Sequence, residues 1–434
     1  MENILAQSAK VTEAAEVFKV SSEETSVQFE TNRLKHLQTK QKTSIALRIV
    51  KDGKLGYATT TDLEDYQNLI DSALETARFG MLARFKMPAP DTYPQVDIFD
   101  ADVESVPVEA MVKLGEELIA KVTGHTPDII CEAGVSRGTV SVQIMNSSGG
   151  QASYRKSFFS MGIEGSLIND TDMLFVGESE SSCRPLPESD TVAKAVLQQL
   201  ELAKNRASVS SKPLPVIFTP NGFASAIMPS LMAAFNGKIV LEGASPIGKR
   251  LGQQVFDQKF SMRDDPTIAY RPGSRSFDDE GVPSQRTPLV EKGTATGFLY
   301  DLQTAATANT RSTGNGSRGR GGMMAPSPSA FVIAPGDTSF EEMVGDTKEG
   351  LVIEQLMGAE QGNVLGGDFS GNVLLGYKVE NGKIVGRVKD TMVSGNIYQA
   401  LKEVSAIGNK AKWAGSFLQA PHLCLPSLSV ASKQ

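Results

Sequence analysis

The sequence predicts an α+β fold, with an N-terminal α+β region of antiparallel strands and helices followed by a β-rich, barrel-like C-terminal domain. Up to about residue 212, segments with alternating apolar residues are interleaved with segments in which apolar residues recur every three or four positions. Beyond that point, glycines and short strand-like segments dominate. We therefore expect three regions, an N-terminal α+β region at 1–105, a middle α+β region at 106–212 and a β-rich domain at 213–434.

The first region is expected to begin with a meander over residues 24–60. Apolar and polar residues alternate there, and Asp52-Gly53 is typical of a hairpin turn. The following apolar repeat predicts a helix with Asp62 as its N-cap. A second helix is expected to begin near Pro107, since proline suits the first turn of a helix.

The middle region returns to strand signals over residues 128–176, with a turn at 146–150. A helix is expected to begin at Ser189, which is a favourable N-cap residue. Residues 212–215 contain two prolines and break the pattern, so we place the main domain boundary there.

The C-terminal domain is expected to consist mainly of short strands. Asn381-Gly382 is a strong hairpin signal between the last two of them. The expected strands are 298–307, 330–333, 374–379 and 384–388, and short helices are expected near 339–348 and 396–404.

The composition is that of an ordinary globular protein. Lys and Arg number 43 against 50 Asp and Glu, so the net charge of −7 makes nucleic acid an unlikely partner. No run of about eighteen apolar residues predicts a membrane span, and the polar N-terminus does not resemble a signal peptide. The three cysteines are too few for a disulfide framework, so we expect a cytoplasmic protein.

Two short motifs suggest chemistry that their surroundings do not support. Residues 314–319 match the glycine pattern of dinucleotide-binding loops, but the prolines and glycines that follow do not predict the required helix. Gly134-Val-Ser136-Arg-Gly138 matches a nucleophile elbow, but the next residues alternate like a strand. We expect a connecting loop in the first case and a structural serine in a hairpin turn in the second.

Two further groups of residues leave alternatives open. Arg311, Arg318 and Arg320 lie among glycines and could bind an acidic peptide, a partner or a nucleic acid, although a solvated loop is the simpler interpretation. His422 and Cys424 lie two apart in an expected strand and could ligate a metal. The apolar residues around them favour a buried strand instead.

Several short motifs of the C-terminal domain together carry a family resemblance. With them, the chain from about Val216 to Val430 resembles the TldD/PmbA family, in particular its PmbA (TldE) branch. The motifs are Gly297-Phe-Leu-Tyr-Asp301, Ser312-Thr-Gly-Asn315, Ala334-Pro-Gly336, Gly350-Leu-Val-Ile353, Gly367-Asp-Phe-Ser370, Gly376-Tyr-Lys-Val-Glu380 and Asn381-Gly382.

The resemblance implies that this chain lacks its relatives' zinc site. Catalytic TldD members resemble zinc metalloproteases that place His-Glu-x-x-x-His on a helix, with a later Cys as third ligand. In an ungapped match, Met228 and Ala233 stand where the histidines would be, and Pro229 stands where the glutamate would be. The late Cys would fall near Lys412-Trp413. We therefore expect no catalytic residue, no metal ligand and no cofactor in this chain, and expect zinc in a TldD-type partner.

The resemblance also implies a dimer that encloses a chamber for unfolded or leader peptides. The partner would be a TldD-like catalytic subunit or a second copy of this chain. An extended peptide can add to an exposed strand edge, and we expect Gly314, Asn315 and Gly316 to contact it, because glycine permits close backbone approach. Two alternatives stay open, a metallopeptidase with its own atypical site or a regulator such as the family's modulators of DNA gyrase.

Overall fold

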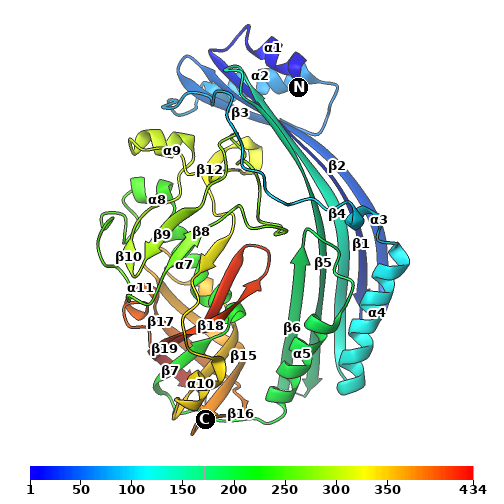
Figure 1. Ribbon diagram of the computed structural model, residues 1–434, viewed down its shortest axis with the longest axis vertical. Coiled ribbons are helices and arrows are strands. Elements are labelled where there is room, and N and C mark those ends of the chain that lie inside the picture. The colour runs from blue at the N-terminus through cyan, green and yellow to red at the C-terminus, as the bar shows by residue number, and fades with distance from the viewer. Residues whose placement is uncertain (171, 434) are drawn as a thin grey trace.

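The computed structural model describes residues 1–170 and 172–433 and confirms the α+β fold (Figure 1). A tall, curved antiparallel sheet forms the N-terminal half, and a closed barrel with short additional strands and helices forms the C-terminal half. Along the described residues, no helix combines the length and apolar character needed to cross a membrane.

Six strands form the N-terminal sheet in the order β3-β2-β1-β4-β5-β6. The predicted meander is confirmed, and Asp52 and Gly53 both adopt positive φ at its second turn. Because β1 pairs with both β2 and β4, the first two predicted regions share one sheet. The strands are β1 (Ala14–Glu30), β2 (Arg33–Lys51), β3 (Lys54–Thr60), β4 (Ile130–Asn146), β5 (Gln151–Asn169) and β6 (Asp172–Ser182).

Helices cover one face of this sheet. The helices α1 (Glu2–Ser8) and α2 (Tyr66–Ala77) pack near β1–β3, whereas α4 (Val108–His125) and α5 (Asp190–Ala203) pack over β4–β6. The predicted cap of α2 is wrong. Asp65 accepts the hydrogen bond from Asn68 N, because Asp62 is engaged in the preceding turn by Glu64 N.

The barrel closes because β7 pairs with strands on both sides. It runs parallel to β14 and antiparallel to β19, which completes a ring through β15 and β17. The ring strands are β7 (Lys212–Phe218), β14 (Glu349–Met357), β15 (Asp368–Glu380), β17 (Thr391–Asn396) and β19 (Leu418–Ser432).

The remaining C-terminal elements confirm most of the predicted ones and correct one. Residues 298–307 do not form a strand. Asp301 begins α9 (Leu302–Thr307) through a capping box with Thr304. Asn381 and Gly382 form the predicted turn, both with positive φ. The other elements are α3 (Asp102–Ser105), α6 (Pro220–Ala226), α7 (Met228–Ala234), α8 (Gly237–Leu241), β8 (Met262–Asp264), β9 (Thr287–Glu291), β10 (Thr294–Ala295), β11 (Gly316–Arg318), β12 (Met324–Pro326), β13 (Phe331–Ile333), α10 (Phe340–Gly345), β16 (Lys383–Arg387), α11 (Ile397–Ala400), β18 (Ala406–Ala414), and 3-10 turns at Arg320–Gly322 and Ala359–Gln361.

Candidate functional site

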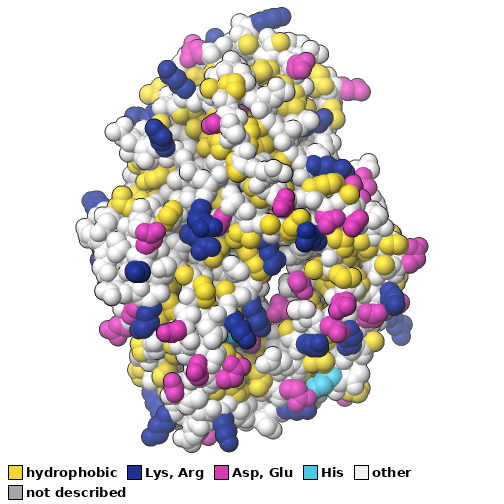
Figure 2. Space-filling view, viewed as in Figure 1, with side chains coloured by type: hydrophobic (Ala, Val, Ile, Leu, Met, Phe, Trp, Pro, Cys, Tyr) yellow, Lys and Arg dark blue, Asp and Glu magenta, His cyan; other side chains and the backbone are white. Residues whose placement is uncertain are grey.

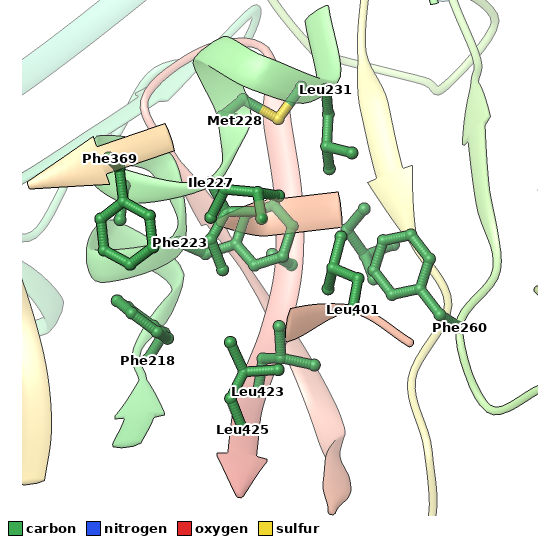
Figure 3. Close-up of a cluster of buried hydrophobic side chains, with 14 of the residues drawn as sticks. Phe218, Phe223, Ile227, Met228, Leu231, Phe260, Phe369, Leu401, Leu423 and Leu425 are labelled. Carbon is green, nitrogen blue, oxygen red and sulfur yellow. The ribbon is translucent and has the colours of Figure 1, made fainter. Parts of the chain in front are cut away.

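The segment that the resemblance aligns with the zinc motif forms a core element here. Thr219 caps α6 by accepting a hydrogen bond from Gly222 N, and Pro229 starts the short α7. Met228 is 1% exposed and belongs to the buried apolar cluster of Phe223, Ile227 and Leu231 (Figure 3).

These residue types do not fit the donor set of a zinc ion. Structural and catalytic zinc sites use Cys, His and carboxylate ligands. Met228 offers only a thioether that faces apolar neighbours, and Ala233 offers no donor. Pro229 has no group that could act as a general base. No step of metal-assisted hydrolysis can therefore be assigned to this helix.

The alternative metal ligands in β19 face surroundings that favour a structural role. The His422 ring packs against Phe340, with ring centroids 4.5 Å apart. Burial lowers the pKa of His422 to about 4, and the positive charge of the nearby Lys412 contributes to this shift. Cys424 lies in an apolar cluster, where burial raises its thiol pKa to about 11. Within residues 1–170 and 172–433, no three His, Cys, Asp or Glu side chains are grouped closely enough to hold a metal ion.

Ser136 lies in the middle of a long strand and not at an elbow. The strand prediction for the residues after it is confirmed, but the hairpin turn expected at Gly134 and Gly138 is wrong, because β4 continues through both glycines. The Ser136 hydroxyl is 2.8 Å from the hydroxyl of Ser160 on β5. The strand-turn-helix geometry of a serine nucleophile is therefore absent at Ser136.

A large cavity lies between the uncovered face of the N-terminal sheet and the C-terminal half, and Figure 2 shows a hollow between the two lobes. Its volume is about 1270 Å³, above the usual range of about 300–1,000 Å³ for small-molecule pockets. The sheet contributes residues of β1, β2, β4, β5 and β6, and the opposite wall comes from α6, β14, β15 and residues 415–416. The space is therefore large enough for a peptide segment.

The floor of this cavity is made of small and polar side chains that line up across the strands. Their counterparts on the other sheet face are apolar and pack under α4 and α5. The first row is Ser26, Ser136, Ser160 and Ser181, and the next is Gln28, Gly134, Gly162 and Ser179. Because most of these side chains are short, the sheet surface stays open to a ligand.

Two carboxylates approach the cavity from opposite halves of the molecule. Glu178 comes from β6 and Glu354 from β14, where Thr219 donates a 2.8 Å hydrogen bond to Glu354 Oε2. Burial raises the pKa of Glu354 to about 7, and the negative charge of the neighbouring Glu178 contributes to this shift. Burial also raises the pKa of Glu178 above its ordinary value. The cavity wall therefore holds two groups that gain from a nearby positive charge.

The two sheet edges near the cavity differ in how open they are. At β6, the side-chain amide of Gln199 accepts a 2.9 Å hydrogen bond from Gly177 N and donates a 3.1 Å hydrogen bond to Gly177 O. Arg271 donates a hydrogen bond to the Ser181 carbonyl. At β2, residues 33–44 pair only with β1 in the part of the chain that the structure describes. The β2 edge is therefore free for an added strand, and Gln38 and Lys40 of this segment line the cavity.

Comparisons with known proteins bear on this architecture. The family model described as the PmbA/TldA metallopeptidase C-terminal domain matches residues 211–432, and the one described as PmbA/TldA metallopeptidase domain 1 matches residues 15–77. The chain belongs to the PmbA/TldD family. An uncharacterized protein of Methanocaldococcus jannaschii is 29% identical, with 89% of this chain and 90% of the relative covered. A metalloprotease PmbA homolog of Haemophilus influenzae is 26% identical, with 93% and 89% covered.

Solved structures share the fold over the whole chain. TldE from Thermococcus kodakarensis superposes with a TM-score of 0.89 at 21% identity and 100% coverage of both chains. A Thermotoga maritima protein described as a candidate modulator of a DNA gyrase gives a TM-score of 0.89 at 22% identity and 99% coverage of both. At these identities the superpositions establish the PmbA/TldD fold and no shared activity.

In this member of the PmbA/TldD family, the predicted peptide-contact residues are buried. Asn315 Nδ2 donates to Asp264 Oδ2 at 2.7 Å, and Gly316 N donates to Asp278 Oδ2 at 2.7 Å. Gly314 is buried as well, with a positive φ of 71°. Their contact with a peptide stays a prediction, and the structure assigns all three a packing role.

The glycine-rich loop that follows does not form a nucleotide site or an arginine patch. A 3-10 turn over Arg320–Gly322 follows β11, so the helix that would hold a pyrophosphate is absent here. Arg318 forms a 2.6 Å ion pair with the buried Glu16, whereas Arg311 and Arg320 are exposed. The three arginines therefore do not act together on one surface.

Proposed function

We propose that this chain is a PmbA/TldE-like, non-catalytic subunit of a TldD/TldE-type zinc metalloprotease that acts on unfolded or leader peptides. A TldD-like catalytic subunit, or a second copy of this chain, completes the dimer, and the zinc belongs to the TldD-like partner. The observation that carries the proposal is the helix at Met228–Ala234, where Met228, Pro229 and Ala233 supply neither zinc ligands nor a base. We also propose a cytoplasmic location, consistent with three buried free cysteines.

The peptide-binding part of the proposal rests on the cavity and the free edge of β2. An extended peptide paired with residues 33–44 would gain main-chain hydrogen bonds without demanding a particular sequence. From this edge the peptide would continue across the sheet, where the open floor of Ser26, Ser136 and Ser160 leaves room for its main chain. The exposed residues 319–321 of the glycine-rich loop would contact the peptide. This loop is anchored by the buried Gly314, Asn315 and Gly316.

Affinity purification from the native host, followed by mass spectrometry and metal analysis, tests the subunit role. We expect a chain of similar length that carries His-Glu-x-x-x-His to copurify, with zinc in the complex. Replacing that partner's histidines should abolish peptide cleavage. Recovery of this chain alone, with stoichiometric zinc and chelator-sensitive cleavage, would instead establish an enzyme with its own site.

The other two functions receive less support from the geometry. An atypical metallopeptidase site would have to use His422 and Cys424, which are engaged by Phe340 and an apolar cluster. A role in gyrase modulation is described for a structural relative, and nothing in the arrangement of Arg311, Arg318 and Arg320 favours DNA.

A further inference from the structure

We propose that the cavity between the sheet and the barrel selects peptide segments that carry positive charge. This inference rests on the proposed peptide-binding function and adds a substrate class to it. Within the part of the chain that the structure describes, seven glutamates line the cavity against a single lysine, Lys40, and no arginine. The carboxylates are Glu24, Glu30, Glu132, Glu164, Glu178, Glu180 and Glu354.

The charge imbalance is local to the cavity. The whole chain carries 43 basic and 50 acidic residues, so its surface is nearly balanced. Among the described residues, none of the seven carboxylates forms an ion pair. Elsewhere in the fold, Arg48 forms ion pairs with two fully buried acids, Glu16 and Glu280.

The nearby cations are not in ion-pair contact with these carboxylates. Lys40 lies opposite Glu24 across the β1–β2 pair without forming an ion pair. Lys412 interacts with Glu178 and Glu354 only by longer-range electrostatic attraction, and Arg271 interacts with Glu180 in the same way. The protein's own side chains therefore leave most of this negative charge available to a ligand.

The strand register concentrates like charges instead of separating them. Glu132 on β4 lies directly opposite Glu164 on β5, and the same row continues to Gly177 on β6. Like charges directly opposite each other destabilise a sheet. A lysine or arginine side chain placed over this row would relieve the repulsion, so bound peptide and sheet would stabilise each other.

The rest of the cavity defines the shape of the ligand. The serine and glycine rows leave room for a main chain lying over the sheet, and the charged residues stand around them. Ile130 and Phe175 line the end of the cavity beyond Glu132 and Glu164, where they offer a place for one apolar side chain. The ligand class is an extended peptide segment with basic residues and at most a few bulky apolar ones.

Fluorescence anisotropy with labelled, unstructured peptides tests this inference on the full chain. One peptide has Lys at every third position among Gly, Ser and Ala, and matched peptides carry Glu or Gln there. We expect the Lys peptide to bind about tenfold more tightly than the Glu peptide at low ionic strength. The difference should shrink as salt is added, because the Debye length falls from about 30 Å at 0.01 M to about 3 Å at 1 M.

A pair of variants separates the cavity from general electrostatics. The double variant E132Q/E164Q keeps side-chain size and removes two carboxylates from the cavity, so the preference for Lys should fall to about threefold or less. The double variant E109Q/E116Q removes two carboxylates from α4, on the covered side of the sheet, and should leave the preference unchanged.

The outcomes distinguish this inference from the function on which it rests. Equal binding of the Lys and Glu peptides, or an unchanged preference in E132Q/E164Q, would overturn the charge selection and leave peptide binding in place. If the chain bound none of the peptides, alone or copurified with its partner, the peptide-binding role itself would be overturned as well.

Discussion

At the scale of single residues, Gly316 passes so close to two carboxylates that it has no room for a side chain. A Cβ there would lie 2.6 Å from Glu280 Oε2 and 2.9 Å from Asp278 Oδ2. We expect Gly316→Ala to lower the free energy of unfolding by about 2 kcal/mol, because the buried carboxylates must shift. Denaturant unfolding measures this loss. The control Gly124→Ala, with nothing within 4 Å in the exposed part of α4, should be neutral or slightly stabilising.

Glu354 predicts a pH dependence with a definite sign. Burial raises its pKa from 4.5 to about 7, so between these values the folded chain holds a proton that the unfolded chain has released. The stabilisation from this proton is complete below pH 4.5 and is lost as pH rises through about 7. The Glu354→Gln variant cannot bind this proton, so it lacks this pH-dependent stabilisation.

Denaturant unfolding at several pH values measures the Glu354 effect. Relative to the wild type, E354Q should gain about 1 kcal/mol in free energy of unfolding between pH 5 and 7.5, since solvent at the cavity screens a partly buried group. Parallel pH curves for the two proteins would show that the carboxyl titrates normally. The control E109Q should follow the wild-type curve, because Glu109 lies on the exposed surface of α4.

At the scale of elements, α9 depends on one capping residue. Asp301 is 2% exposed, and its side chain accepts hydrogen bonds from both the backbone N–H and the hydroxyl of Thr304. We expect Asp301→Ala to lower the free energy of unfolding by about 1–2 kcal/mol, because a buried N–H loses its partner. The exposed Asp337→Ala is a matched control and should change stability by less than about 0.5 kcal/mol. Equal effects of the two variants would contradict the capping argument.

Local pattern predicted most elements and failed where a single cap or a distant partner decides. The alternation in residues 24–60 predicted β2, β3 and the end of β1, although β1 already begins at Ala14, and the Asn381-Gly382 turn predicted the β15–β16 hairpin. The apolar residues near Phe298 resemble a strand, but Asp301 and Thr304 start a helix. Closure of the barrel was not predictable in detail, because β7 pairs with β14 and β19 from the far end of the chain and periodicity says nothing about partners.

The candidate site was predictable only in part. The family resemblance pointed to residues 228–233, and the structure places these residues in the short helix α7. The sequence did not reveal the cavity, because Glu178 and Glu354 meet only through the packing of the two halves. A usable signal was present in the alternating small residues of β4, β5 and β6, such as Gly134 with Ser136, since these are unusually short for one whole face of a sheet.

At the scale of the whole molecule, a buried ionic cluster joins the two halves that enclose the cavity. Arg48 on β2 pairs with Glu16 on β1 and with Glu280 from the C-terminal half, and all three side chains are fully buried. Arg318 on β11 adds a second contact to Glu16, at 2.6 Å. The cluster therefore fixes how the sheet sits against the C-terminal half.

Removing Arg48 should destabilise the assembly of the two halves. In Arg48→Met, Glu16 keeps Arg318, but Glu280 is left without a cation in a buried site. Breaking a buried pair costs about 3–5 kcal/mol, because the remaining charge is uncompensated. Denaturant unfolding should show a loss of this size, and the affinity for a cavity-binding peptide should fall with it. Lys113→Met, which removes the exposed pair with Glu117, should cost less than about 1 kcal/mol. A similar small cost for R48M would mean that apolar packing alone positions the sheet, and the cavity would then keep its shape without the cluster.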